Sequence, residues 1–471
     1  MNTRYNGLVA FCYLFIFNIF SFAYSLGFLY VYPRVKLEAK TPSLGDPGEP
    51  LILTPYIDKG NIELAQNVSR VPLTEKIGFI SHAGFFTVNK KYNSNLYFWY
   101  FPAFNKNKDA PVVLWLQGGP GGSSLFGLFT ENGPLVAKKE GFSIRKHHWA
   151  LKNHLIFIDN PVGTGFSFTN KDGYCTDEEC IAKGLYSCLD QFFNMFPNLR
   201  KNEFYITGES YAGKYIPSLG VEIHNQNMLN KQKINLKGLA LGNAYCDPIN
   251  QMDYGDYLYQ HGLIDDRQRN FFNKMQVEIV KNIKKENWVE AGILMDSLMD
   301  GDLTNFSYFK NFTGFDNYYN FLIPLNMSDM SIYIDMLNNE EIRRSAHVGA
   351  LPFQTGEEVQ MHLAMDILKS VAPLVADLLS HYRVMFYNGQ LDIIVAYPLT
   401  ENFLCNLNFS SSDEYKKAPR NIWKVNDDIA GYVKKAGNIT EVLVRNAGHM
   451  VPHDQPKWAL DLITRFIENK F

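Results

Sequence analysis

Seven short apolar runs, each bounded by turn residues, constrain the fold of this chain more than any other feature. Helix-like stretches separate most of them, and continuous apolar runs are typical of strands that are buried on both faces. Such strands alternating with helices predict an α/β fold with a largely parallel central sheet. The runs span residues 96–100, 111–116, 155–158, 204–207, 238–242, 383–387 and 441–445.

A mostly helical stretch at residues 243–346 interrupts this alternation, and its clearest helix is predicted at 267–288. We interpret the stretch as a helical cap inserted into the sheet-forming core. The predicted division of the chain is a signal peptide at 1–25, an N-terminal arm or pro-segment at 26–80, a first part of the core at 81–242, the cap at 243–346 and a second part of the core at 347–471.

The first residues are typical of a secretory signal peptide. Arg4 precedes an apolar run at 8–22, and Ala23-Tyr24-Ser25 provides the small residues of a cleavage site. The alternative is an uncleaved anchor, because apolar residues continue to about Tyr32 and that length would span a bilayer. With the leader cleaved, we expect no stable membrane insertion. Both interpretations place the rest of the chain in the secretory pathway, either secreted or in the lysosome.

Sequons are frequent and agree with that compartment, although chance matches are expected in an Asn-rich chain. Three of them lie close together in the predicted cap, which indicates an exposed, glycosylated segment. The candidate glycosylation sites are Asn67, Asn305, Asn311, Asn326, Asn408 and Asn438.

Five cysteines remain once Cys12 leaves with the leader, so at least one thiol is unpaired within the chain. Thr176 to Glu179 predict a capping box that opens a helix ending near Phe196. On that helix Cys180 and Cys188 would lie too far apart for a bridge. Two pairings stay open: Cys175 with Cys180, and Cys246 with Cys405.

Composition excludes several classes of protein. The chain of 471 residues is 46% hydrophobic and 20% charged, so it can bury a large core and is not mainly disordered. A net charge of −3 argues against a protein that binds nucleic acid by neutralising phosphates. No zinc-ligand spacing is present, and His147 and His148 lack a His-Glu-x-x-His pattern. We therefore expect neither metal nor cofactor.

The strand at 204–207 leads directly into Gly208-Glu209-Ser210-Tyr211-Ala212 and a helix. Small residues at positions 208 and 212 let strand and helix approach, and the sharp turn would expose the hydroxyl of Ser210. This is the pattern of a nucleophile elbow. It departs from Gly-x-Ser-x-Gly by one methyl group, at Ala212.

A nucleophilic serine needs a base, and the base needs an orienting acid. Asp392 follows the strand at 383–387, and His449 follows the strand at 441–445. This order is the one found on folds that carry such an elbow. We prefer His449 to His453 because it lies just beyond the strand end.

An oxyanion hole requires a backbone N–H after the nucleophile, here Tyr211, and another from an early strand–helix loop. Gly118-Gly119-Pro120-Gly121-Gly122 follows a strand and fits the second part. A phosphate cradle is the alternative for a glycine-rich loop, but no Lys-Ser/Thr follows it.

Together these motifs resemble those of the serine carboxypeptidases, and most closely the vitellogenic-like members of that family. The resemblance covers most of the chain after about Ser81, in order. It rests on residues 115–121, 160–167, 208–213, 387–395 and 448–452.

The resemblance implies an α/β-hydrolase fold with a helical cap and serine carboxypeptidase activity that is favoured at acid pH. By motif position, Ser210 would be the nucleophile, His449 the base and Asp392 the orienting acid. The oxyanion donors would be Gly119 and Tyr211. The residues that would hold the terminal carboxylate of the substrate are Gln117, Gly118, Glu131 and Glu209.

Two departures affect what is carried over. Many relatives have Asn at the position of Gln117. The side-chain amide that would bind the substrate carboxylate therefore extends further in this chain than in those relatives. Many also have Cys at Gly122 together with more disulfides, so bridges are not transferred.

The main prediction is release of single C-terminal residues from peptide or protein C-termini. An acyltransferase or esterase on the same scaffold, or a non-catalytic secreted binding protein, are the alternatives. The sequence leaves the oligomeric state undetermined.

Overall fold

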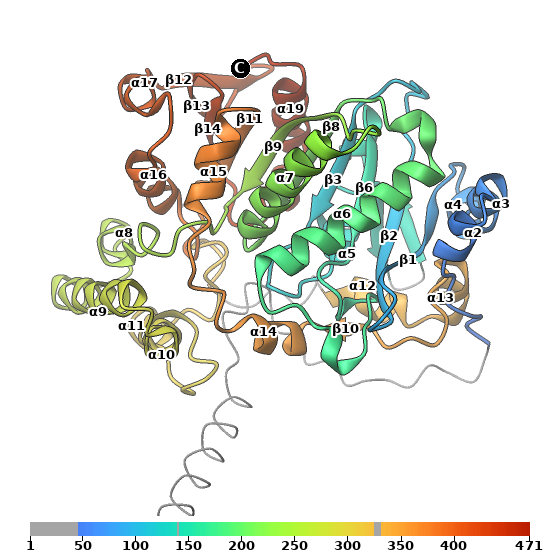
Figure 1. Ribbon diagram of the computed structural model, residues 1–471. Helices are drawn as coiled ribbons and strands as arrows, with labels where there is room; N and C mark the ends of the chain where they lie inside the picture. Colours follow the sequence, from blue (N-terminus) through green and yellow to red (C-terminus); the bar gives the residue numbers. More distant parts are fainter. Residues whose placement is uncertain (1–45, 139–140, 325–330) are drawn as a thin grey trace, which may run out of the picture.

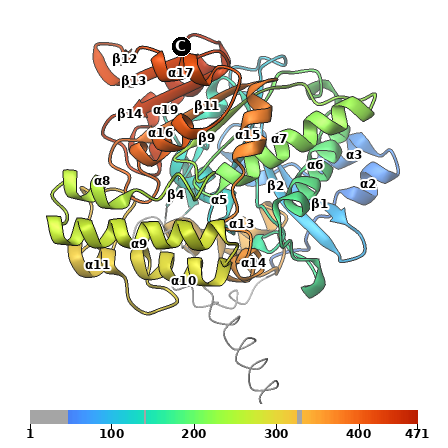
Figure 2. The same ribbon diagram turned by 60° about the vertical axis from the view of Figure 1, so that its left-hand side comes forward.

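In a computed structural model, residues 46–138, 141–324 and 331–471 are described. Within them, ten strands form the central sheet in the order β1-β2-β6-β3-β8-β9-β11-β14-β13-β12 (Figures 1 and 2). In chain order the strands are β1 (His82–Asn89), β2 (Ser94–Phe101), β3 (Val112–Leu116), β6 (His154–Ile158), β8 (Phe204–Glu209), β9 (Leu236–Gly242), β11 (Arg383–Gly389), β12 (Asn421–Val425), β13 (Asp428–Ala436) and β14 (Ile439–Val444).

The strands from β6 to β14 along the sheet pair in parallel, which confirms the predicted α/β fold. Both edges are antiparallel, formed by β1 and β2 on one side and by β12 and β13 on the other. Three strands, β1, β12 and β13, were not predicted from the sequence. The antiparallel strands β12 and β13 keep part of their surface towards solvent, so they lack the continuous apolar run that identifies a buried parallel strand.

Helices cover both faces of the sheet. On β9, Leu239 lies against Gly220 of α7 (Ala212–Leu229), whereas its neighbour Gly238 lies against Phe466 of α19 (Pro456–Ile467). Successive residues of a strand point to opposite faces, so α7 and α19 pack on opposite sides. Contacts also join α7 to α6 (Glu178–Met195) and α15 (Ala372–Leu379).

The predicted cap stretch is helical, as Figure 2 shows for its larger part. Its helices are α8 (Tyr254–Gln260), α9 (Asp266–Lys284), α10 (Trp288–Met299), α11 (Tyr308–Thr313), α12 (Ile332–Leu337) and α13 (Glu340–Ser345). The helix predicted at 267–288 is wrong at its end, because Glu286 has a positive φ of 59° that separates α9 from α10. Whereas α9 contacts α8 and α10, α12 packs against β4 (Leu135–Lys138) and α13 against α4 (Pro72–Lys76).

The described part of the N-terminal arm packs on the β1 edge. Leu53 donates its N–H to Phe85 O at 2.8 Å, and Ala65 and Val71 are buried in the core. This segment contains α2 (Thr54–Asp58) and α3 (Ile62–Val68) in addition to α4. The predicted signal peptide lies outside the described residues.

Short elements complete the described chain. They are α5 (Ser124–Phe126), η1 (Gly127–Glu131), β5 (Gly141–Ile144), η2 (Trp149–Leu151), β7 (Thr164–Gly165), η3 (Lys171–Gly173), η4 (Pro197–Leu199), β10 (Gln354–Thr355), α14 (Glu357–Leu363), α16 (Tyr397–Asn406), α17 (Ser412–Lys417) and α18 (Val451–Asp454). Among the helices that the structure describes, none is both long and apolar enough to cross a membrane.

The structure contains one of the two cysteine pairings that the sequence left open. Cys175 and Cys180 form a disulfide with a Cα–Cα distance of 5.5 Å, while Cys246 and Cys405 are free. The capping residue is Asp177, whose side chain accepts a hydrogen bond from Cys180 N at 2.8 Å. The capping box predicted from Thr176 is therefore wrong by one residue, because the extended backbone at Asp177 already places a carboxylate over the first turn.

The sequon asparagines within the described ranges are all exposed, at positions 67, 305, 311, 408 and 438. Asn326 lies outside those ranges. Nδ2 of Asn438 donates to Leu379 O at 2.9 Å, so a glycan at this position would leave one N–H on Nδ2 for that contact. Glycosylation at the other positions stays a prediction.

Candidate active site

Ser210 stands at the tight turn between β8 and α7. Its φ of +62° is a conformation that L-residues seldom adopt, and its N–H donates to Gly242 O at 2.9 Å. A Cβ at Gly208 would lie 2.2 Å from Leu116 O, so only glycine fits the strand side of the turn. Ser210 is 1% exposed, and its hydroxyl has no hydrogen-bond partner among the described residues.

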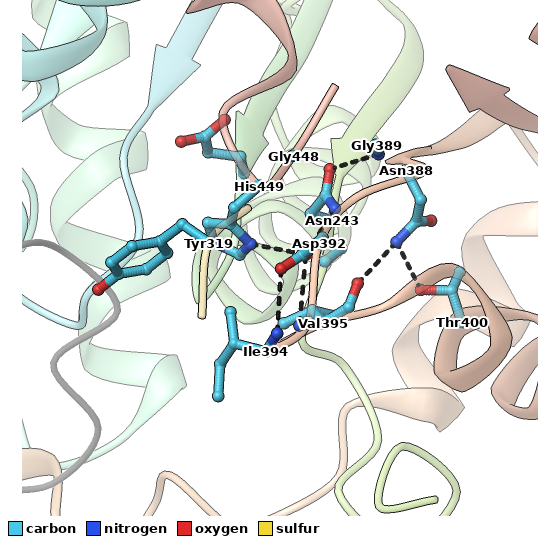
Figure 3. Close-up of polar contacts among 12 residues, drawn as sticks. Asn243, Tyr319, Asn388, Gly389, Asp392, Ile394, Val395, Thr400, Gly448 and His449 are labelled. Carbon is cyan, nitrogen blue, oxygen red and sulfur yellow. Dashed lines mark hydrogen bonds and ion pairs between the residues drawn. The ribbon is translucent and has the colours of Figure 1, made fainter. Parts of the chain in front are cut away.

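Asp392 and His449 meet at the carboxyl ends of two paired parallel strands, β11 and β14 (Figure 3). Nδ1 of His449 lies 2.8 Å from Oδ2 of Asp392, and both side chains are completely buried. Because a carboxylate only accepts hydrogen bonds, Nδ1 carries the proton in this contact and Nε2 is the basic nitrogen. Nε2 has no partner in the described part of the chain. His453 lies elsewhere, with Nδ1 3.0 Å from Thr130 O.

The carboxylate of Asp392 is held by further donors that were not predicted from the sequence. Nδ2 of Asn243 donates to Oδ2 at 2.6 Å, and the backbone N–H groups of Ile394 and Val395 donate at 3.0 and 3.3 Å. Asn243 comes directly after β9, so the rule that located Asp392 at a strand end could also have identified it. Donors of this kind hold the acid in one orientation towards the base.

The glycine-rich loop packs directly against the elbow. A Cβ at Gly118 would lie 2.5 Å from Tyr211 N, and Gly119 has a φ of +118°. Gly119, Ser210 and Tyr211 line one cavity of about 20 Å³. The rest of its lining is aromatic or aliphatic and consists of Tyr245, Tyr254, Met295, Ile394 and Val395.

A cluster of carboxyl groups lies beside the nucleophile. Nε2 of Gln117 donates to Glu131 Oε1 at 3.0 Å and to Glu209 Oε1 at 2.8 Å. Oε1 of Gln117 accepts from Trp115 at 2.8 Å, which orients the amide with its donors towards the carboxyls. Both glutamates are completely buried.

Burial away from water raises the pKa of the Glu131 carboxyl to about 7. Burial, and then the charge of Glu131, raise the pKa of Glu209 well above its usual range. The two carboxyls lie close together, because one amide nitrogen of Gln117 donates to both. Two like charges at short range disfavour each other, so the pair retains a proton near neutral pH.

The described residues contain no group of three or more His, Cys, Asp or Glu side chains that could hold a metal ion. The groups that are present supply a serine hydroxyl at a strained turn and a histidine base oriented by a carboxylate. Acyl transfer through the serine oxygen is the chemistry that such groups perform.

Comparison with known proteins agrees with this geometry. The model of the serine carboxypeptidase family, Peptidase_S10, matches residues 72–469. The chain belongs to the serine carboxypeptidase family. It is 51% identical over 459 residues to a venom serine carboxypeptidase of Apis mellifera, covering 96% of this chain and 98% of the relative. It is 49% identical over 433 residues to a vitellogenic carboxypeptidase of Aedes aegypti, covering 91% and 92%.

A solved structure supports the same assignment. A prohormone-processing carboxypeptidase from Saccharomyces cerevisiae matches with a TM-score of 0.68 and 25% identity, covering 83% of this chain and 91% of the other. The predicted family and the α/β-hydrolase fold are confirmed, and this chain is a serine-type peptidase that acts on peptides.

Proposed function

We propose that this serine carboxypeptidase removes single C-terminal residues with Ser210 as nucleophile, His449 as base and Asp392 as orienting acid. The observation that carries the proposal is the buried 2.8 Å contact between His449 and Asp392, with Nε2 of the same ring left available. The turn that carries Ser210 begins at the end of β8, in the same parallel sheet.

In the proposed reaction, Oγ of Ser210 attacks the scissile carbonyl while Nε2 of His449 takes its proton. The backbone N–H groups of Gly119 and Tyr211 would stabilise the oxyanion. Collapse of the tetrahedral intermediate transfers the proton from His449 to the leaving amine. Water, deprotonated by the same imidazole, then hydrolyses the acyl-enzyme and regenerates Ser210.

Restriction to the C-terminus would come from the carboxyl cluster. Gln117, Gly118 and the Glu131–Glu209 pair would bind the free carboxylate of the substrate, with the shared proton completing a hydrogen bond between acidic groups. The need for that proton favours acid pH. An ester without a free carboxylate would leave the buried pair without a role, so we favour the peptidase over the esterase alternative.

We also propose that the protein enters the secretory pathway. The sequence begins with a signal-peptide pattern, and the Cys175–Cys180 disulfide fits an oxidising compartment. Secretion and delivery to the lysosome both agree with these features.

The test is labelling and replacement of the nucleophile. A serine-directed organophosphonate should modify Ser210, and Ser210→Ala should lower kcat by about 10⁴- to 10⁶-fold with an unchanged circular dichroism spectrum. Ser218→Ala, a buried serine in the helix that follows the turn, serves as the control. Labelling at another residue, or activity above about a hundredth of wild type in the purified variant, would contradict the assignment.

A further inference from the structure

A short loop of the predicted cap lies between the acid and the base. This loop, residues 316–324, is closed on itself by backbone contacts: Asp316 N and Asn317 N both donate to Pro324 O, at 2.9 and 3.2 Å. Nδ2 of Asn317 donates to Ile323 O at 2.8 Å, and its Oδ1 accepts from Tyr319 N at 2.8 Å. Asn317 is 1% exposed, so one buried amide joins both arms of the loop.

One side of the loop tip contacts the segment that carries the acid. Tyr318 O accepts hydrogen bonds from Ile393 N at 3.0 Å and Ile394 N at 3.2 Å, and Phe321 N donates to Leu391 O at 3.0 Å. These contacts bracket Asp392 on both sides in sequence. The loop therefore fixes the backbone from which the carboxylate extends.

The other side of the tip contacts the segment that carries the base. Tyr319 O accepts from the backbone N–H of His449 at 2.7 Å, and the centroids of the Tyr319 ring and the imidazole are 5.6 Å apart. Figure 3 shows Tyr319 beside His449. Gly448 lies against the same carbonyl, since a Cβ there would be 2.3 Å from Tyr319 O. Nδ2 of Asn320 and the N–H of Gly448 share Oδ2 of Asp454, at 3.2 and 2.6 Å.

We propose that the 316–324 loop is a positioning element for catalysis, and that Asn317 is its positioning residue. This inference rests on the proposed roles of Asp392 and His449. The two side chains come from loops after different strands, and adjacent carbonyls of one rigid loop hold both backbones. Asn317 contacts neither side chain, so it acts by keeping the loop closed.

The physical consequence is a loss of rate rather than of binding. Small displacements of catalytic groups reduce turnover strongly, whereas the substrate-binding cluster around Gln117 lies on other elements. The expected signature of an opened loop is a lower kcat with little change in KM.

Two variants test the positioning role of the loop, one within the loop and one in the segment that carries His449. Asn317→Ala removes the amide that closes the loop, and Gly448→Ala pushes a methyl group against Tyr319 O. The control is Asn282→Ala, another buried asparagine of the cap stretch, whose Nδ2 donates to Glu278 O at 3.0 Å within α9. All proteins are compared by kcat, KM, thermal midpoint and the rate of organophosphonate labelling.

We expect kcat and the labelling rate to fall on the order of 10²-fold in Asn317→Ala and Gly448→Ala, with KM nearly constant. The double variant should lose less than the product of the two single losses, because both disturb one contact. Asn282→Ala should lose thermal stability without this fall in kcat.

Wild-type kcat in a folded Gly448→Ala protein would overturn the proposal, even if Asn317→Ala failed to fold. Equal kcat losses in Asn317→Ala and Asn282→Ala at matched stability would also overturn it. These results are separate from a failure of the proposed function, which would appear as wild-type protein not labelled at Ser210.

Discussion

At the scale of single residues, the unusual feature is a pair of completely buried carboxyls beside the nucleophile. A buried charge is costly unless it is paired, so Glu131 and Glu209 are kept in a protonation state that water would not favour at neutral pH. Gln117 donates to both of them, which orients the pair before substrate arrives. A third carboxylate can join this cluster only while the pair retains a proton.

We therefore predict that KM for a blocked dipeptide rises as the pH passes through about 7, the value to which burial raises the pKa of Glu131. The corresponding dipeptide amide lacks the third carboxylate and should show a flatter KM profile. The double variant Glu131→Gln with Glu209→Gln should lose most of the rise. Steady-state kinetics between pH 5 and pH 8 would measure it.

Glu178 provides the matched control for that experiment. It is also a buried carboxyl, and burial raises its pKa to about 8, but it lies at the start of α6, outside the cluster. Glu178→Gln should keep the wild-type dependence of KM on pH. The same KM profile for both substrates in all variants would show that the pair does not bind the terminal carboxylate.

At the scale of elements, a helix of the predicted cap contributes to the cavity next to Ser210. Met295 of α10 is buried and lines that cavity together with Tyr245 and Tyr254. The cavity is small, with a volume of about 20 Å³. In the proposed reaction it would receive the side chain of the residue before the scissile bond, so small residues should be preferred there.

Met295→Ala should widen this cavity and raise kcat/KM for a substrate with Phe before the scissile bond, relative to one with Ala, by about tenfold. Met299→Ala, a buried methionine on the same helix that does not line the cavity, is the control for general loosening of α10. A ratio that changes equally in both variants would assign the effect to stability of the helix instead of to the cavity.

At the scale of the whole molecule, buried acids and buried histidines both contribute to the dependence of stability on pH. Burial raises the pKa of Asp159 to about 6, that of Glu131 to about 7 and that of Glu178 to about 8. Burial also lowers the pKa of His82 and His148 to about 4. Between about pH 4 and pH 6, both the acids and the histidines are therefore mainly neutral in the folded protein.

The acids and the histidines make the free energy of unfolding change with pH in opposite directions. For the acids, the native state binds more protons than the unfolded state, so their stabilisation is present at low pH and is lost as the pH rises from about 4.5 to 8. For the histidines, the unfolded state binds more protons, so their contribution is lost as the pH falls from about 6.5 to 4.

We predict that the thermal midpoint falls as the pH rises from about 5 to about 8, because over this range the three acids lose more stabilisation than the two histidines gain. Scanning calorimetry from pH 4 to pH 8 would measure it. Glu178→Gln should make this decline shallower, because it removes one of the titrating acids. A midpoint that rises steadily up to pH 8 would contradict this account.

The sequence alone was enough to predict the α/β fold, the order of the central strands along the chain and the positions where polar residues follow strand ends. The physical reason is local: a strand buried on both faces must be continuously apolar, and the turn at Ser210 leaves room only for glycine at position 208. These requirements can be recognised in a few consecutive residues. The predicted site residues Asp392 and His449 were identified in this way, and their roles remain proposals.

Only the tertiary structure decided which distant residues meet. The antiparallel edges, the pairing of Cys175 with Cys180, the contact of Asn243 with Asp392 and the 316–324 loop between acid and base have no periodic signature. Asn243 and Asp392 are 149 residues apart, and the loop acts through backbone carbonyls, which every sequence possesses. Such contacts depend on how the elements pack against one another. No local pattern in a single sequence therefore identifies them.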